Sequence, residues 1–401
     1  MKKVLVLVLA AMLALSLVAC TTSAPAPQTE AAAPAEEAAP AEAAAETTEA
    51  AAPAGTGEAF DDFPHPAVVA NDQIKVGLLH SPLSYEYNIR VVAQCKLECA
   101  YRGWEFVDGL YEEEAAARDV WKTLINSGCN VIILMALDNT DAYADLVAES
   151  RNKGIGVYCS DNTITTGIIS NVTMPGGVAA LEMAYYLGNE YGWNAKNCIL
   201  CADGNRNHAE RARSYYGFTQ GIYTDFTTLA YSDVGGVAES MQNSYDYTQA
   251  WLQQYGDDID IIFGSCDAFA MSAAEAIKAN GDTKGEKTIT VGIDGGNDSW
   301  SVLREGGPFK LSYAQPGELF MHTTLEIAKQ IQVDGLKPGD DGCTLAKVGQ
   351  TIFCSGSIVT MDNLPDQGQP IHAAFDYYTE PDNPEAWYNW CPDGFEIYSI
   401  E

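Results

Sequence analysis

Short apolar runs alternate with amphipathic stretches from Asp72 onward. The first unit is an apolar run at 74–79, followed by a helical stripe of apolar residues over 89–102 that ends at Gly103. The same order of strand and helix returns further along the chain, at 131–134, 141–153 and 156–159. Continuous apolar strands between helices are typical of a parallel sheet covered on both faces. This half of the chain therefore predicts one α/β lobe.

A second series of the same kind begins after Asn171. Its expected helices cover 176–191, 209–224, 237–255 and 268–280, and its expected strands cover 198–201, 229–231, 259–263, 288–291 and 310–313. The chain of 401 residues is also longer than one compact core usually holds. We therefore predict an α/β fold of two doubly wound parallel-sheet lobes. Their strand ends are expected to face a shared cleft, which suits binding between domains.

Residues 1–20 have the pattern of an export signal. Two lysines precede an apolar run at 4–18, which is shorter than the roughly 20 residues of a membrane-spanning helix. The run ends in Leu-Val-Ala-Cys, which resembles the lipobox of bacterial lipoproteins, so Cys20 is the expected lipidation site. Residues 21–58 are almost entirely Ala, Pro, Glu, Thr, Ser and Gly, a composition that predicts a disordered tether. We therefore expect an extracytoplasmic protein held at the outer face of the cell membrane by its lipid.

The composition argues against other classes of protein. Lys and Arg number 22 against 55 Asp and Glu, and a formal net charge of −33 does not suit a nucleic-acid binder. Eleven cysteines are too few in 401 residues for a disulfide framework, so the fold must depend on burial. Cys198 and Cys201 have CxxC spacing, but they lie on an expected strand where residues three apart face opposite ways, which favours buried structural thiols. No metal or cofactor is expected.

Polar residues follow the ends of five expected strands, at 80–88, 160–162, 265–267, 292–296 and 314–316. In this order they resemble the type 1 periplasmic binding proteins, in the ribose- and galactose-binding branch that shares its fold with LacI-type sensor domains. The resemblance covers about 74–359, which is nearly all of the expected globule.

The resemblance also implies how the chain divides between the lobes. Three crossings are expected, near Asn171, near Gln315-Pro316 and near Cys354-Ser355. They assign 72–171 plus 316–354 to an N-terminal lobe, and 172–315 plus 356–401 to a C-terminal lobe that carries an extension. This extension is rich in Tyr and Trp, and we expect it either to pack on a lobe or to rim the cleft.

Six ligand contacts are implied by the resemblance: Ser81, Tyr85, Tyr87, Asp161, Asp294 and Gln315. These residue types suit a hydroxyl-rich ring, because carboxylates and amides match its edge and aromatic rings match its faces. An Asp after a strand is alternatively a helix cap or a turn former, but its presence in both lobes favours ligand contact. Further contacts are expected beside these, at Asp138, Asn162, His208, Arg213, Cys266 and Asp267.

Several positions depart from the family pattern. The ligand-binding Arg matches Arg213 in one branch, whereas Arg211 is displaced by one residue from another branch, so the choice between them stays open. Ala136 with Asp138, Asn162 and Cys266 stand where the ribose-type pattern has Asn, a basic residue and Asn. Neither ribose nor galactose is therefore assumed as the ligand.

The resemblance implies a monomeric solute-binding lipoprotein that captures a small sugar or polyol and delivers it to the permease of an ABC importer. One alternative keeps the binding fold but passes the signal to a membrane receptor. A less favoured alternative is a glycosidase with Asp161 and Asp294 as its carboxylate pair. The sequence shows no P-loop, nucleophile elbow or metal constellation in support of an enzyme.

Overall fold

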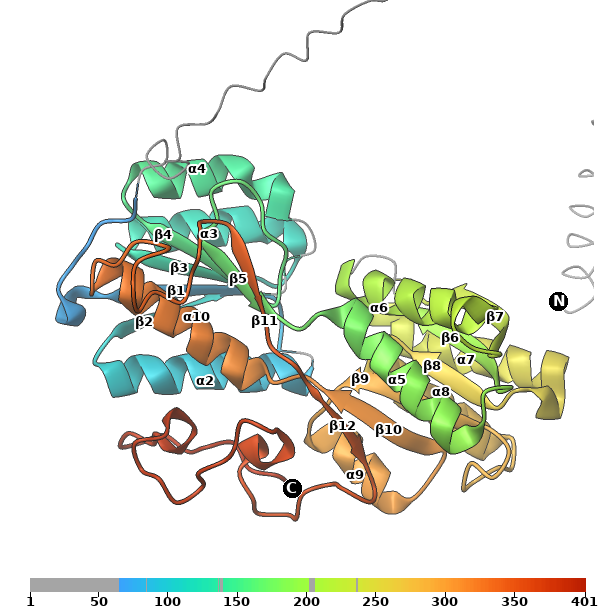
Figure 1. Cartoon of the computed structure of the whole chain (residues 1–401). Helices are drawn as coiled ribbons and strands as arrows, with labels where there is room; N and C mark the ends of the chain where they lie inside the picture. Colours follow the sequence, from blue (N-terminus) through green and yellow to red (C-terminus); the bar gives the residue numbers. More distant parts are fainter. Residues whose placement is uncertain (1–64, 84, 136, 138–139, 202–205, 236) are drawn as a thin grey trace, which may run out of the picture. The chain divides into compact units, whose positions relative to one another are not determined.

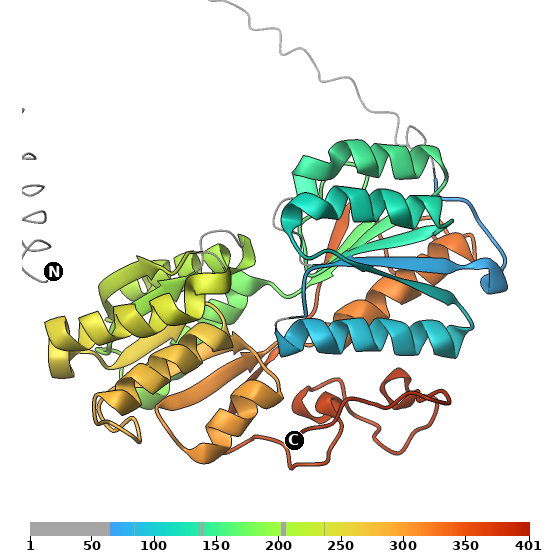
Figure 2. The same cartoon turned by 180° about the vertical axis from the view of Figure 1, so that it is seen from behind.

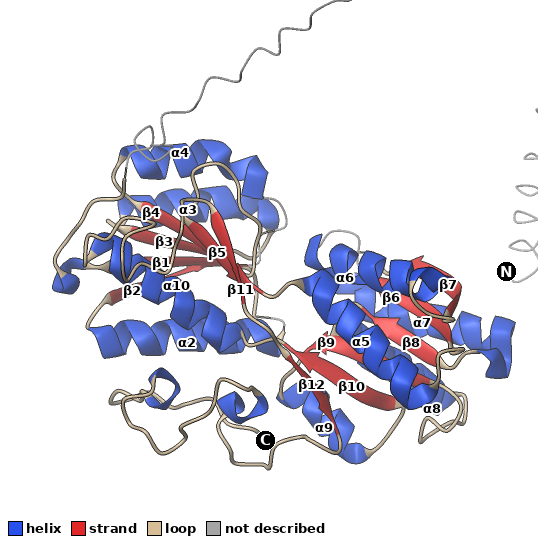
Figure 3. Ribbon diagram, in the orientation of Figure 1, coloured by secondary structure: helices blue, strands red, loops and turns tan. Residues whose placement is uncertain are grey.

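The computed structural model describes residues 65–401 except 84, 136, 138–139, 202–205 and 236. Two six-stranded sheets, each with helices on both faces, make up this part of the chain (Figures 1 and 3). The predicted α/β fold of two lobes is therefore confirmed. The expected signal over 1–20, the lipidation site Cys20 and the tether over 21–58 lie outside the described residues, as do Ala136 and Asp138.

The first sheet has the strand order β11-β5-β4-β3-β1-β2, and all its neighbouring strands are parallel. Helices α3 and α4 cover one face of this sheet, and α2 and α10 cover the other (Figures 1 and 2). The strands are β1 (Lys75–His80), β2 (Glu105–Leu110), β3 (Val131–Met135), β4 (Gly156–Ser160), β5 (Ser170–Thr173) and β11 (Gln350–Phe353). The helices are α2 (Glu86–Arg102), α3 (Ala117–Asn126), α4 (Ala144–Asn152) and α10 (Gly317–Gln332).

The second sheet has the order β12-β10-β9-β8-β6-β7, in which only β12 is antiparallel to its neighbour. Helices α5 and α6 lie on one face, with α7 and α8 on the other (Figures 1 and 2). The strands are β6 (Lys196–Cys201), β7 (Thr227–Asp233), β8 (Ile261–Gly264), β9 (Ile289–Asp294), β10 (Phe309–Ala314) and β12 (Ser357–Thr360). The helices are α5 (Gly176–Tyr191), α6 (Arg206–Gly217), α7 (Val237–Tyr255), α8 (Asp267–Ala279) and α9 (Asn297–Glu305).

The chain passes between the two sheets at three places. It leaves β5 for α5 across 174–175, leaves β10 for α10 across 315–316, and leaves β11 for β12 across 354–356. Asn171, near which the first crossing was expected, lies inside β5 and pairs with the neighbouring strands β4 and β11. Three short crossings of this kind allow two lobes to rotate with little internal repacking.

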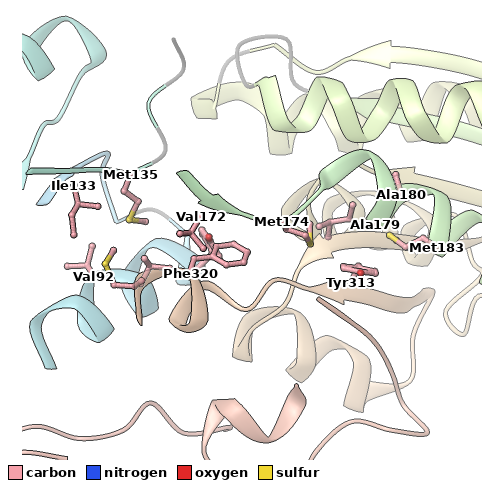
Figure 4. Packing of buried hydrophobic residues seen from close by; sticks show 14 of the residues in the cluster. Val92, Ile133, Met135, Val172, Met174, Ala179, Ala180, Met183, Tyr313 and Phe320 are labelled. Carbon is pink, nitrogen blue, oxygen red and sulfur yellow. The ribbon is translucent and has the colours of Figure 1, made fainter. Parts of the chain in front are cut away.

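The apolar strands are buried because helices cover both faces of each sheet. All five residues of β3 and of β4 are buried, as expected for continuous apolar strands in a parallel sheet. One buried cluster extends from the first sheet through Val172 and Met174 into the second, where it includes Met183 and Tyr313 (Figure 4). Gly103 ends α2 in the left-handed conformation with φ 72°, which glycine adopts without steric cost.

Residues 361–401 follow β12 and contain only two short 3₁₀ turns among the described elements, Ile371–Ala374 and Trp387–Asn389. In both Figure 1 and Figure 2 this red segment runs beneath α2. Across the described ranges, no helix has both the length and the apolar character that crossing a membrane requires.

Candidate ligand-binding site

Two aspartates at strand ends have unusual backbone conformations. Asp161 directly follows β4 with φ 54°, and Asp294 ends β9 with φ 150°. Within the described residues they are the only non-glycine residues with positive φ. Such conformations cost free energy for residues with a Cβ, and they gather at functional sites where the surroundings hold them in place. The backbone thus marks the same two residues that the strand-end pattern predicts.

Asp294 is held by an arginine and an amide. Arg211 on α6 donates from Nη1 to Asp294 Oδ1 over 3.1 Å, and Gln315 at the second crossing donates from Nε2 to the same oxygen over 2.7 Å. Arg211 is only 2% exposed and also donates to the carbonyl oxygen of Ser265 over 2.9 Å. Burial raises the pKa of Asp294, and the Arg211 guanidinium opposes that rise by favouring the carboxylate.

Asp161 is bonded from both lobes. Its Oδ1 accepts a hydrogen bond of 2.9 Å from Thr173 on β5 and one of 3.3 Å from the Asn207 amide on α6. The Tyr87 hydroxyl lies beside this carboxylate, and burial together with Asp161 raises the pKa of Tyr87. Since Asn207 belongs to the second lobe, Asp161 is a point where the two lobes meet.

Buried polar atoms near Asp294 that have no hydrogen-bond partner within the described part of the chain include Arg211 Nε, Gln315 Oε1 and Ser265 Oγ. Buried polar groups in proteins are almost always hydrogen-bonded, so each such exception requires an explanation. Here one donor, one acceptor and one hydroxyl gather near Asp294. A small molecule with several hydroxyl groups could satisfy all three.

Asp267 and Cys266 lie next to this site and are both buried. Asp267 Oδ2 accepts from Ser312 Oγ over 2.6 Å and from the Gly295 backbone N–H over 2.9 Å, so it holds the turn that follows Asp294. Burial, reinforced by the nearby Asp294, raises the pKa of Asp267 to about 7. Cys266 is buried before α8, and burial raises the pKa of its thiol.

The remaining expected contacts lie in varied surroundings. Tyr85 precedes α2, but its ring packs against the apolar cluster of the second lobe that contains Cys266. Ser81 Oγ accepts a 3.2 Å hydrogen bond from Asn88. Asn162 is buried, and its backbone N–H donates to Asn171 Oδ1 over 3.1 Å.

Helix α6 separates the residues that face the site from those that do not. Arg213, the arginine carried over from the family pattern, is exposed, whereas Arg211 is buried against Asp294. His208 is half-buried, with its ring edge against Phe269, and burial next to Arg211 lowers its pKa to about 3, so it is neutral. The sequence left Arg211 open as the alternative to Arg213, and it did not assign Asn207. The spacing of four residues between Asn207 and Arg211 puts both on one helix face.

The arrangement combines carboxylate acceptors with guanidinium and amide donors at the carboxyl ends of strands from both sheets. This set of groups can form charge-assisted hydrogen bonds to hydroxyl groups. Ligands of doubly wound sheets bind at such strand ends. No cluster of three or more His, Cys, Asp and Glu suited to a metal ion occurs in the described ranges.

A family model described as "Periplasmic binding protein domain" matches residues 76–333, which is more than half of the chain. A search of curated proteins gave no match.

Solved structures with the same fold include the following three. An ABC sugar transporter subunit from Rhodobacter sphaeroides 2.4.1 is 16% identical, with a TM-score of 0.60, and the match covers 72% of this chain and 99% of that one. The Caulobacter myo-inositol binding protein bound to myo-inositol is 18% identical, with a TM-score of 0.62 and coverages of 73% and 94%. A periplasmic solute-binding protein from Actinobacillus succinogenes 130z with bound D-allose is 16% identical, with a TM-score of 0.62 and coverages of 72% and 98%.

Proposed function

Because the chain belongs to the periplasmic binding protein domain family, we propose that it is an extracytoplasmic solute-binding protein that captures a small sugar or polyol between its lobes. Delivery to the permease of an ABC importer completes this proposal. The observation that carries it is the convergence of Asp294, Arg211, Gln315 and Asp161 at strand ends of both sheets. Binding, not catalysis, is the role that these groups suit, since both carboxylates are engaged by hydrogen-bond donors.

The ligand class rests on the chemistry of the site and on its relatives. Structures with this fold are described as holding myo-inositol and D-allose, both compact molecules with many hydroxyl groups. The donors and acceptors around Asp294 and Asp161 suit such molecules in the same way. At the contacts named above the chain departs from the ribose-type pattern, so we propose a sugar or cyclic polyol other than ribose or galactose.

Among the ligand contacts we propose Arg211 in place of Arg213, because Arg211 is the arginine that reaches Asp294. Tyr87, Asp161, Asn207, Ser265, Asp294 and Gln315 complete the proposed set. Ser81, Asn162, His208 and Asp138 stay as expectations from the family pattern. In this proposal Asp267 holds the turn after Asp294 in place, and it does not contact the ligand. Cys266 and Tyr85 belong to the apolar packing of the second lobe.

Lipid attachment at Cys20 and use by an importer belong to the same proposal. The apolar run and the lipobox-like Leu-Val-Ala-Cys support the lipid anchor. The membrane-receptor alternative requires the same cleft and differs only in the partner. Uptake of the ligand by a reconstituted permease, measured with and without this protein, distinguishes the two alternatives. Only the importer alternative predicts transport that depends on the protein.

The proposal is tested by a thermal-shift screen of the protein against sugars and polyols that include myo-inositol, D-allose and arabinose. A ligand at about 100 times its dissociation constant stabilises the folded state by roughly 2.7 kcal/mol. We expect at least one compound to raise the melting temperature without being consumed. If none of the panel raises it, or if the compound is hydrolysed, the proposal is wrong.

The paired variants Arg211→Ala and Arg213→Ala then test the site itself. Both remove an arginine from α6, but only Arg211 is buried against Asp294. We expect Arg211→Ala to weaken the dissociation constant by roughly 30-fold or more, as for loss of a desolvated charged partner. Arg213→Ala is the matched control and should bind as the parent does in calorimetry. Equal losses in the two variants would contradict the site.

A further inference from the structure

Residues 361–401, here called the strap, lie beyond the family match, which ends at residue 333. The strap contacts both lobes, although by its place in the chain it follows the second sheet. Its contacts with the second lobe differ in chemistry from its contacts with the first lobe.

The contacts of the strap with the second lobe are apolar and deep. Ile371, Phe375 and Ile400 are each no more than 5% exposed and share one cluster with residues of α8, α9 and β10. Arg304 on α9 donates to the carbonyl oxygens of Glu401 over 3.0 Å and of Pro365 over 2.6 Å. Exposing these apolar side chains to water would cost free energy, so this part of the strap stays packed on the second lobe in the folded protein.

The contacts of the strap with the first lobe are aromatic and polar, and near α2 they include the buried His372 and the half-buried Tyr377, both beside Arg90. Trp390 stacks on Tyr101 of α2 with ring centroids 4.0 Å apart and an interplanar angle of 7°, and the Arg102 guanidinium lies 5.2 Å from the Trp390 ring. Trp387 stacks on His322 of α10 at 4.3 Å. Tyr101 stays 46% exposed, so this contact lies at the rim of the interface. Stacking between rings and a cation over a ring each contribute only modest stabilisation, so these contacts can break without unfolding either lobe.

The face of the first lobe beneath the strap is charged, with its own ion pairs. Glu98 on α2 accepts from Arg102 over 2.7 Å and from Gln94 over 3.0 Å, and His322 Nδ1 lies 3.0 Å from the same carboxylate. Arg102 also bonds Glu326 of α10 over 2.5 Å. These four partners of Glu98 and Arg102 all belong to the first lobe. Withdrawal of the strap therefore leaves Glu98 and Arg102 with their partners, so neither becomes an unpaired buried charge.

The two lobes touch at the cleft while the strap is docked. Asn207 of the second lobe bonds Asp161 of the first, and Arg206 bonds Thr163 over 3.3 Å. On the side of the strap, Glu86 of α2 accepts from the Asp298 backbone N–H in the first turn of α9 over 2.7 Å. A helix N-terminus favours such a carboxylate. Strap docking and cleft contact thus occur in one arrangement of the lobes.

We propose that the strap is an intramolecular latch. Its aromatic end, Trp387 and Trp390, docks on α2 and α10 when the lobes meet and leaves them when the cleft opens. The latch therefore raises the population of the closed arrangement before any ligand arrives. Its effect on affinity rests on the proposed binding function, because a larger closed population lowers the apparent dissociation constant of a ligand that needs both lobes.

The test measures the distance between the lobes in the protein without ligand. Labels are attached through non-natural amino acids at Lys122 on α3 and Asp257 beyond α7, which avoids the native thiols. Electron-electron distance measurements compare the parent with Tyr101→Ala, Trp390→Ala and the double variant. Tyr191→Ala is the matched control, because Tyr191 is also a 46% exposed helix tyrosine but lies on α5 of the second lobe, outside the contact of Trp387 and Trp390 with α2 and α10.

We expect both single variants to move the distribution to longer distances. Trp390→Ala removes the stack on Tyr101 together with the Arg102 contact, so its closed-to-open ratio should fall about tenfold, and Tyr101→Ala removes the stack alone, so its ratio should fall by a smaller factor. The double variant should match Trp390→Ala, because that change already removes the stack on Tyr101. Parent-like distributions, or additive effects of the two changes, would overturn the latch.

A second measurement uses a ligand found by thermal shift. We expect the dissociation constant to weaken in Tyr101→Ala and Trp390→Ala by the ratio of the closed fractions of the parent and the variant, at most about tenfold, and to stay unchanged in Tyr191→Ala. Tighter binding in the strap variants would overturn the latch, since it would mean that the strap holds the cleft open. If no compound binds the parent, the proposed function fails, while the distance measurement still decides whether the latch exists.

Discussion

At the scale of single residues, Asp161 and Asp294 show what a strand-end pattern can and cannot specify. An Asp after an apolar strand is a recognisable feature of a sequence, and both Asp161 and Asp294 lie where the pattern puts them. The partner of Asp294 is another matter, since Arg211 and Arg213 sit two positions apart on one helix. Which of them faces the cleft depends on the angle at which α6 packs, and a short polar helix does not encode that angle.

The pairing of Asp294 with Arg211 predicts a cost in stability as well as in binding. Asp294→Ala leaves a guanidinium that is 2% exposed without its carboxylate, and loss of one partner of a buried pair typically costs about 3 to 5 kcal/mol. We expect denaturant unfolding of the protein without ligand to show a loss of that size. The double variant Asp294→Ala/Arg211→Ala should recover part of it, because no buried charge remains unpaired. A double variant less stable than Asp294→Ala would contradict this pairing.

Asp267 predicts a dependence of stability on pH. Burial and Asp294 raise its pKa from 3.8 to about 7 in the folded protein. The folded state therefore holds a proton that the unfolded chain releases above pH 4. The stability contributed by this group is complete below about pH 4 and is lost as pH rises toward 7.

Asp267→Asn keeps a neutral side chain of the same shape, so the variant should lose less stability than the parent between pH 4 and pH 7. Urea unfolding at several pH values measures this difference. The control is Asp282→Asn, whose carboxylate caps a surface loop and has a lowered pKa, so it should not flatten the profile. Parallel profiles for the parent and Asp267→Asn would contradict the raised pKa.

At the scale of elements, the continuous apolar strands were predictable, whereas β2, β5, β11 and β12 were not. The strands β3 and β4 read as continuous apolar runs because helices cover both their faces. β2 lies at the sheet edge and has only one buried residue in Glu105–Leu110. Its sequence therefore lacks the continuous apolar run by which strands such as β3 and β4 were recognised. Helix α9 was not predicted either, because Asn297–Glu305 is short and mostly polar.

Helix α2 presents a second difficulty to sequence analysis, which is a buried stripe made of charged and polar residues. Glu86, Arg90, Gln94, Glu98 and Arg102 recur every four residues along α2, and the first four are at most 9% exposed. An apolar stripe would have indicated burial, whereas this one reads as a solvated face. Its burial is explained by Glu318 and His322 on α10 and by Tyr377 of the strap, which lies beside Arg90.

This charged stripe supplies a prediction about the α2–α10 contact. Burial would raise the pKa of Glu98, but His322 and Arg102 outweigh burial and hold that pKa below its ordinary value of 4.5. Glu98→Ala removes a fully buried carboxylate and leaves Arg102 and His322 without it, so we expect unfolding free energy to fall by about 3 to 5 kcal/mol. Glu326→Ala, which removes the more exposed partner of Arg102, should cost about 1 kcal/mol or less.

Urea unfolding at neutral pH compares these two variants. In acid the difference between Glu98→Ala and the parent should shrink, because a carboxylate with a lowered pKa contributes stability above its unfolded pKa and loses it as pH falls through the folded one. Equal costs for Glu98→Ala and Glu326→Ala would contradict the assignment of the stripe as a buried ionic contact.

At the scale of the whole molecule, the order of elements was enough to predict the fold, and the family match confirms it. The strap was recognised as an extension, but its course was not predictable. Its 3₁₀ turns and irregular backbone have no periodicity, and its rings contact residues more than 60 positions away. Long-range contacts without a repeating pattern are the part of a structure that one sequence does not specify locally.

The N-terminal segment leads to a prediction about where the molecule is held. With a formal charge of −33 the chain is repelled by an anionic membrane surface, and nothing in its acidic tether composition favours adsorption. A diacyl group contributes about 0.8 kcal/mol for each buried CH₂, and two chains anchor a protein stably where one does not. If Cys20 carries that group, it supplies essentially all of the membrane affinity.

Cys20→Ala should therefore move the protein from the membrane fraction to the soluble extracytoplasmic fraction and abolish incorporation of radiolabelled lipid. The matched control is Cys391→Ala, since Cys391 is an exposed free cysteine at the other end of the chain. That variant should stay with the membrane and keep its label, because a thiol in the strap has no signal-peptidase motif before it. Ligand binding should be unchanged in both variants, since neither position belongs to the proposed site. Retention of Cys20→Ala on the membrane at the level of the parent would mean that another segment anchors the chain, and the lipoprotein assignment would then be wrong.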